Sequence, residues 1–327
     1  MKRTVWAIGA VLVVVGIIFG FRSFSSVRPA PKAPRTVSVG YMAFASNWPL
    51  FLAQEGNFFG KQELAVTLVK FASGVDGINA LARGDIALMV VNPLTDLMNI
   101  EARSPGLFRI YAMQQSVTSG NYTDTMLVTK SSPLQTLGDL TGKKVGVNPG
   151  TFAEGMIKIL LEQKNIKGVT FVQLAPNLQL QALQSGQIDA LVAYEPATTM
   201  ALTDGTARVL EPHPFEDVMS PFPNVAFTVS SKILKDDRDT ADRLITAMEQ
   251  AIVYGRTNAT EANTAAAKYV GIPAELLNKL RYPDQLLGNE IDKKRVQEVA
   301  DLFYQKGIAS QRVDVTGLFY IHETATR

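Results

Sequence analysis

Residues 139–155, with the sequence DLTGKKVGVNPGTFAEG, could bind an anion or another hydrogen-bond acceptor. A short buried strand is predicted at 143–147, and the turn residues Asn148-Pro149-Gly150 follow it. Thr151 and Glu154 have the capping-box spacing of a helix start. A helix N-terminus presents unpaired backbone N–H groups, so this unit suits a ligand with negative charge. It could equally be an ordinary structural unit in which Thr151 only caps its helix.

Glu195 is a second residue with informative chemistry, because it precedes Pro196 at another predicted helix start. The helix dipole favours a carboxylate at that position, which is a purely structural reason for it. In a ligand cleft, the same carboxylate could bind an amine or another N–H donor. The sequence leaves both roles open.

Catalytic chemistry has little support in this sequence. The chain has no cysteine, and its two histidines, His213 and His322, do not lie near a G-x-S-x-G motif. It also has no H-E-x-x-H, Walker A or G-x-G-x-x-G motif. The acidic run at 236–239 is more typical of a helix-start surface than of a metal site. We therefore predict no catalytic residue, no cofactor and no metal ion.

Strands and helices alternate from Thr36 onward, and the same series occurs twice. The first series is predicted at 37–41, 47–55, 65–71, 73–83 and 86–91, with a helix start at 92–93. The second is predicted at 143–147, 151–163, 169–174, 177–185 and 188–193, with a helix start at 196. The two series also have similar sequences, since ALARGDIAL at 80–88 matches ALQSGQIDAL at 182–191 with one residue inserted.

Alternating strands and helices predict parallel sheets. The duplication therefore predicts an α/β fold of two Rossmann-like lobes with a ligand cleft between them. We expect three regions: a signal or anchor segment with a proline-rich linker at 1–35, lobe 1 at 36–128 plus 225–327, and lobe 2 at 129–224. Later helices are expected at 239–257, 261–270, 273–280 and 292–305. Hinges for closure are expected at 127–130 and 221–226.

The candidate ligand-binding residues follow the carboxyl ends of the predicted strands, where ligands bind in parallel α/β sheets. They are Ser46, Asn47, Trp48, Ser73, Gly74, Asn92, Pro93, Tyr122, Gly150, Thr151, Phe152, Tyr194 and Glu195. Each has a plainer interpretation as well: Ser46, Ser73, Asn92 and Thr151 could serve only as helix caps, and Trp48 could belong to the core.

The N-terminus predicts export across a membrane. Lys2 and Arg3 precede an apolar run at 5–21, and a proline-rich stretch follows. This pattern is typical of a signal peptide or of a single membrane anchor, and the sequence does not separate the two. Beyond residue 35 the chain carries 26 Lys and Arg against 30 Asp and Glu, so nucleic-acid binding has little electrostatic support.

Four segments resemble the type 2 periplasmic solute-binding proteins of ABC importers, in the branch that binds taurine, aliphatic sulfonates, nitrate and thiamine precursors. They are WPLFLAQEG at 48–56, GDIAL at 84–88, DLTGKKVGV at 139–147 and DALVAYEP at 189–196. The resemblance implies that the stretch from Asp139 to Thr151 binds a polar or anionic head group, and that Glu195 can meet an amino group. The cysteines that mark the thiamine-precursor synthases and the deaminase of this fold are absent.

The resemblance implies a non-enzymatic binding protein that delivers a small solute to an ABC permease. It would be periplasmic or held at the outer face of the cytoplasmic membrane through residues 1–35. An enzyme such as a dehydratase, or a sensory binding protein, remains an alternative on the same fold. The residues favour a solute with both an acceptor group and an N–H group, such as an amino-sulfonate or amino-pyrimidine. Nitrate fits less well because Glu195 would repel it.

Overall fold

The computed structural model describes residues 33–117 and 124–322, and the described elements all belong to one compact unit that begins at Arg35. The apolar run predicted at 5–21 lies outside the described residues, so the anchor or signal peptide stays a prediction. Within the described part of the chain, no helix combines the length and the apolar character needed to cross a membrane.

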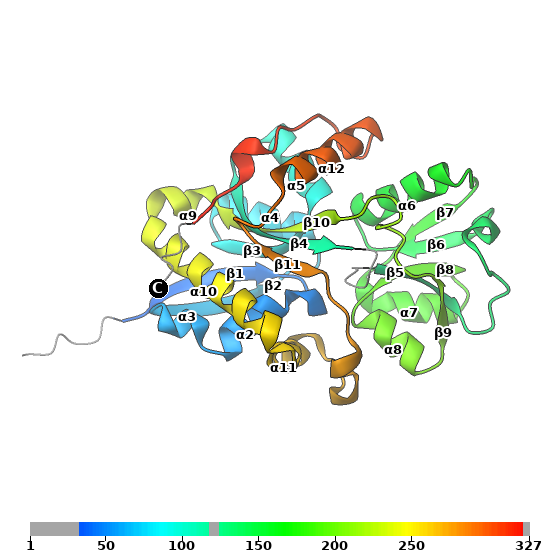
Figure 1. Ribbon diagram of the computed structural model, residues 1–327, viewed down its shortest axis with the longest axis horizontal. Helices are drawn as coiled ribbons and strands as arrows, with labels where there is room; N and C mark the ends of the chain where they lie inside the picture. The colour runs from blue at the N-terminus through cyan, green and yellow to red at the C-terminus, as the bar shows by residue number, and fades with distance from the viewer. Residues whose placement is uncertain (1–32, 118–123, 323–327) are drawn as a thin grey trace, which may run out of the picture. The chain divides into compact units, whose positions relative to one another are not determined.

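Lobe 1 is built on a six-stranded sheet with the strand order β11-β4-β10-β3-β1-β2 (Figure 1). Its strands are β1 (Arg35–Tyr41), β2 (Leu64–Lys70), β3 (Leu88–Pro93), β4 (Phe108–Ser116), β10 (Phe222–Ser230) and β11 (Asp284–Leu287). Strand β1 pairs in parallel with β2 and β3, whereas β10 runs antiparallel to both β3 and β4. The helices of this lobe are α2 (Trp48–Glu55), α3 (Phe58–Lys61), α4 (Gly74–Arg83), α5 (Leu94–Arg103), α9 (Ser231–Asp236), α10 (Arg238–Thr257), α11 (Ala259–Val270) and α12 (Lys293–Gln305).

Lobe 2 is built on a five-stranded sheet with the order β7-β6-β8-β5-β9 (Figure 1). Its strands are β5 (Asp124–Thr129), β6 (Lys144–Val147), β7 (Thr170–Gln173), β8 (Ala190–Tyr194) and β9 (Ala207–Glu211). Its helices are α6 (Phe152–Gln163), α7 (Pro176–Gln184) and α8 (Ala197–Thr203).

The predicted duplication is visible in the topology. The parallel triplet β2-β1-β3 of one sheet has the same order and direction as β7-β6-β8 of the other. In each case the next strand, β10 or β5, is antiparallel. The predicted α/β fold of two Rossmann-like lobes is confirmed, and the four late helical segments are present as α10, α11, η3 (Ala274–Lys279) and α12.

The predicted lobe boundary at 128/129 and the two hinges need correction. Strand β5 was assigned mostly to lobe 1, but it bonds antiparallel to β8 and β9 of the second sheet. The chain therefore passes from the first sheet to the second between Ser116 and Asp124, and it returns between Glu211 and Phe222. The predicted hinge ranges lie mostly inside β5 and β10. Strand β11, which forms one edge of the first sheet, was not predicted.

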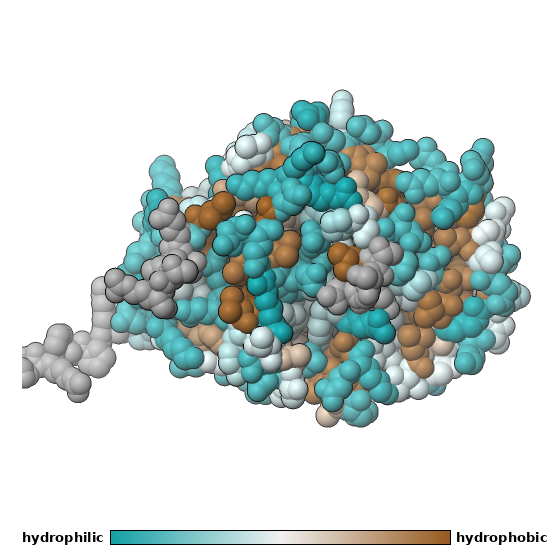
Figure 2. Space-filling model, in the orientation of Figure 1, coloured by the Kyte–Doolittle hydropathy of each residue, from teal (hydrophilic) through white to brown (hydrophobic). Residues whose placement is uncertain are grey.

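The acidic run at 236–239 is a helix-start surface, as the sequence suggested. The Asp237 carboxylate accepts from the backbone N–H of Thr240 and caps α10. Arg35 forms ion pairs with Asp237 and Asp239, which tie the first strand to the start of this helix. The exposed large hydrophobic side chains are scattered over several elements, and the face in Figure 2 is largely hydrophilic.

Gly255 allows α10 to pack closely on α2. A Cβ atom at this position would lie 2.1 Å from Trp48 Cζ3 and 3.0 Å from Leu52 Cδ2. We expect Gly255→Ala to lower the free energy of unfolding by about 1–3 kcal/mol, because overpacking outweighs the better helix propensity of alanine. Denaturant unfolding measures this loss. Gly317→Ala is the control, since no atom lies within 4 Å of its added Cβ; equal stability of the two variants would contradict the packing argument.

Candidate functional site

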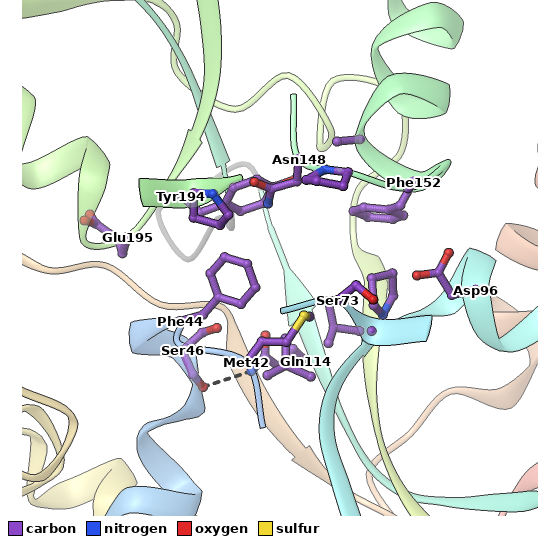
Figure 3. Close-up of a pocket in the computed structure, with 18 of the residues that line it drawn as sticks. Met42, Phe44, Ser46, Ser73, Asp96, Gln114, Asn148, Phe152, Tyr194 and Glu195 are labelled. Carbon is purple, nitrogen blue, oxygen red and sulfur yellow. Dashed lines mark hydrogen bonds between the residues drawn. The ribbon is translucent and has the colours of Figure 1, made fainter. Parts of the chain in front are cut away.

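A cleft that is partly open to solvent lies at the carboxyl ends of the parallel strands of both sheets. Met42 and Phe44 follow β1, Ser73 follows β2, and Asn148 follows β6. Figure 3 shows these side chains converging on one space from the two lobes. The position agrees with the rule for ligand sites in parallel α/β sheets.

Eight of the predicted residues line this cleft. They are Ser46, Ser73, Gly74, Pro93, Gly150, Phe152, Tyr194 and Glu195. Ser73 also caps α4, because its Oγ accepts from the backbone N–H of Asp76 at 3.2 Å. The backbone carbonyl of Ser46 accepts from Gln114 Nε2 at 2.9 Å, which fixes the loop after β1 against β4 (Figure 3). Whether these eight residues bind a ligand stays a prediction.

Asn47, Trp48 and Asn92 do not line the cleft. Asn47 is buried and donates to the backbone carbonyl of Met42, so it holds its own turn together. Trp48 is buried in the core against α10, as the plainer interpretation had it.

Asn92 is the third of these buried residues, and it joins two strands of the first sheet. Its side chain donates to the Met89 carbonyl at 3.0 Å and to Thr228 Oγ1 at 3.1 Å, which links β3 to β10. The predicted helix cap at Asn92 is also wrong, since α5 begins at Leu94 after Pro93. Tyr122 lies outside the described residues.

The capping box predicted at the start of α6 does not form. Thr151 is exposed, and its helical backbone (φ −93°, ψ −17°) lacks the extended conformation of a residue whose side chain caps a helix. The Glu154 carboxylate accepts instead from Lys158 Nζ at 2.5 Å and from Gln173 Nε2 at 3.2 Å. Gln173 Oε1 also accepts from the N–H of Gly150 at 3.3 Å, so one donor of the predicted anion site has a protein partner.

The Glu195 carboxylate accepts hydrogen bonds from the first turn of the helix that follows it, α8. Its oxygens accept from the backbone N–H of Thr199 at 3.1 Å and from Thr199 Oγ1 at 2.8 Å. Burial raises the pKa of Glu195, and the bonds from Thr199 and the nearby Arg281 oppose that rise. These contacts support the structural role, and they leave the carboxylate less available to a ligand than the sequence suggested.

Asp96 is a cleft residue that the sequence analysis missed. It lies in the first turn of α5, and burial raises the pKa of its carboxyl from 3.8 to about 6. Its carboxylate has no hydrogen bond or ion pair to any residue of the described ranges. A signal was available, because Asp96 stands three residues after Pro93, just as Asp76 stands three residues after Ser73.

Aromatic rings from both lobes form part of the cleft wall. Phe44 of lobe 1 and Tyr194 of lobe 2 have ring centroids 5.9 Å apart. Phe152, at the start of α6, stacks on Phe222 of β10 with a centroid separation of 6.1 Å and an interplanar angle of 4°. The wall can therefore contact a flat ring or an alkyl chain of a ligand.

Outside the cleft, the described part of the chain contains a group of three residues whose side chains are of the types that can bind a metal ion. Glu211, His213 and Asp217 place ligand atoms within 4.8 Å of one another. His213 Nδ1 already contacts Asp217 Oδ1 at 3.0 Å. The predicted absence of a metal and of a cofactor stays a prediction.

The comparisons with known proteins identify the family. A family model described as NMT1/THI5 like matches residues 45–262, which is well over half of the chain. The chain belongs to the NMT1/THI5-like family. The match spans both lobes and most of the cleft residues, including Asp96, and it confirms the branch predicted from the four sequence segments.

Relatives of this NMT1/THI5-like chain cover most of its length. A thiamine biosynthesis protein of Haemophilus influenzae is 26% identical over 310 residues, covering 90% of this chain and 92% of the relative. An aliphatic sulfonates-binding protein of Escherichia coli is 24% identical, covering 88% and 89%. The crystal structure of the periplasmic aliphatic sulphonate binding protein SsuA from Escherichia coli superposes with a TM-score of 0.72 at 20% identity, covering 89% of this chain and 94% of SsuA.

The same fold also includes an enzyme. The structure of the desulfurization enzyme DSZB superposes with a TM-score of 0.67 at 16% identity, covering 88% of this chain and 96% of that one. The fold alone therefore does not separate binding from catalysis. The side chains that line the cleft bear on this choice.

Proposed function

We propose that this chain is the extracytoplasmic solute-binding component of an ABC import system. Its two lobes would close on a small polar solute and deliver the solute, chemically unchanged, to a permease. The observation that carries the proposal is the cleft itself, which takes its lining from the carboxyl ends of strands in both sheets and has an aromatic wall. The names of the sulfonate-binding and thiamine-biosynthesis relatives support this class of solute.

A non-enzymatic role is part of the proposal. Among the described residues that line the cleft, none is a histidine or a cysteine. Its carboxylates, Asp96 and Glu195, are not arranged as a nucleophile with a base, since Glu195 is engaged by Thr199. We propose lobe 1 as residues 36–116 plus 222–327 and lobe 2 as 124–211, and we propose that residues 1–35 export or anchor the protein.

Closure of the lobes is the direct test. We expect a solute that binds in the cleft to reduce the radius of gyration in solution scattering, because the lobes close on it. The solute should also raise the melting temperature, because it binds only the folded state. At a concentration 100 times its Kd, the solute should stabilise the protein by about 2.7 kcal/mol.

The probes are short alkanesulfonates, taurine and 4-amino-5-hydroxymethyl-2-methylpyrimidine, added to residues 36–327. Mass spectrometry of the recovered solute then separates binding from catalysis. Identical scattering with a saturating solute would contradict closure, and a changed solute mass would favour the enzyme.

A further inference from the structure

We propose that Asp96 makes one end of the cleft a subsite for a cationic or amino nitrogen, so that the cleft selects amine-bearing solutes over their amine-free analogues. The inference rests on the proposed solute-binding function and goes further, because it names the group that the solute must carry. It also assigns to Asp96 the amine-binding role that the sequence analysis left open for Glu195.

The position of Asp96 places its carboxylate at the cleft surface. It stands on the first turn of α5, directly after the end of β3. A Cβ atom at Gly74 would lie 3.4 Å from Asp96 Oδ2, so the start of α4 passes close to the carboxylate. Figure 3 shows Asp96 and Glu195 at opposite ends of the cleft.

The carboxylate lacks a partner among the described residues. It takes part in no ion pair or hydrogen bond of those ranges, although it is partly buried. A partly buried charge without a partner is unfavourable, and an approaching cation relieves that cost. The raised pKa of Asp96 has burial as its cause. A cationic ligand group would therefore interact with Asp96 without first displacing a partner from the described part of the chain.

One neighbouring group suits an amine. Figure 3 shows the aromatic ring of Phe152 at the same end of the cleft as Asp96, whereas the Ser73 hydroxyl there already donates to Asp76 at 2.7 Å. A carboxylate and an aromatic ring together bind ammonium groups and amino-substituted rings through charge-assisted hydrogen bonds and cation–π contacts.

The opposite end of the cleft differs in charge. Burial raises the pKa of Glu195 there, and Arg281, which also lines the cleft, opposes this rise through a backbone hydrogen bond and its positive charge. Glu195 is bonded to Thr199, so its charge is partly satisfied within the protein. A solute with an amine at one end and an acceptor or anionic group at the other would match this distribution.

The experiment compares matched pairs of probes by calorimetry. The pairs are taurine against ethanesulfonate, and 4-amino-5-hydroxymethyl-2-methylpyrimidine against its 4-oxo analogue. We expect the wild-type protein to bind at least one amine-bearing member about 10- to 100-fold more tightly than its partner, the range for a hydrogen bond to a charged group. Asp96→Asn should remove most of that preference. Asp85→Asn is the matched control, since Asp85 is exposed and paired with Arg83 outside the cleft.

The outcomes separate this inference from the proposed function. Tighter binding of the amine-free probes, or an amine preference that survives in Asp96→Asn, would overturn the Asp96 subsite and leave solute binding intact. Loss of the preference in Glu195→Gln but not in Asp96→Asn would assign the amine to the other end. If no probe and no component of a metabolite extract binds, the proposed function fails, and the inference fails with it. The melting temperature of each variant without solute shows that it is folded.

Discussion

Replacing Phe215 with alanine is expected to lower the free energy of unfolding by about 3–5 kcal/mol, the cost of deleting a buried aromatic side chain. Phe215 is fully buried in the segment between β9 and β10. Its ring contacts Phe152 at 5.2 Å, Phe222 at 6.4 Å and Tyr194 at 6.3 Å between centroids. Because these three rings come from both lobes, the cavity would open where the lobes meet.

Denaturant unfolding measures the loss, and Phe171→Ala is the matched control. Phe171 lies on the edge strand β7, is only half-buried, and has Lys158 Nζ 5.5 Å from its ring centroid. Its replacement should cost clearly less than that of Phe215. Equal losses in the two variants would show that the aromatic cluster between the lobes adds nothing beyond the burial of one ring.

Asp96→Asn is expected to stabilise the solute-free protein at neutral pH and to leave it nearly unchanged at pH 4. Burial raises the pKa of Asp96 from 3.8 to about 6 in the folded state, so the folded protein holds this proton more tightly than the unfolded chain does. The contribution of Asp96 to stability therefore falls as pH rises from about 4 to 6 and is lowest above pH 6. The loss reaches at most about 3 kcal/mol, at 1.36 kcal/mol for each pKa unit.

Asparagine does not titrate, so the variant does not lose unfolding free energy through ionisation at position 96. The unfolding free energy of the variant should therefore exceed that of the wild type by more at pH 7.5 than at pH 4. Asp85→Asn, which alters an exposed carboxylate paired with Arg83, is measured beside it as the control for a surface substitution of the same type. A constant difference for Asp96→Asn at the two pH values would mean that its carboxyl is not held in an unfavourable environment. A saturating amine-bearing solute should reduce the difference, because it stabilises the ionised form.

Local sequence patterns determined most of the fold. Alternating apolar strands and amphipathic helices follow from side-chain periodicity, which needs no knowledge of distant residues. The similar sequences at 80–88 and 182–191 then predicted two lobes, because the same local pattern forms the same βαβ unit twice. The cleft at the strand ends followed from parallel pairing alone.

Pairing between distant segments was decided only by the tertiary structure. Strand β5 joins the second sheet because its backbone bonds to β8 and β9, and its own residues do not reveal these partners. Strand β11 is only four residues long and forms against β4, which lies far from it in the sequence. Short strands of this kind depend on a neighbour that supplies half of their hydrogen bonds.

The partner of each polar side chain was likewise decided by the tertiary structure. The sequence placed Asn92, Thr151 and Glu195 at helix starts, and each polar group then had several partners within reach. Asn92 bonds across to β10, Thr151 points to solvent, and Glu195 bonds to Thr199. Asp96 lines the cleft, and its carboxylate has no hydrogen bond or ion pair to the described residues. The sequence by itself determined the lobes and where they present polar groups, whereas packing decided which of those groups the protein uses internally and which remain for a ligand.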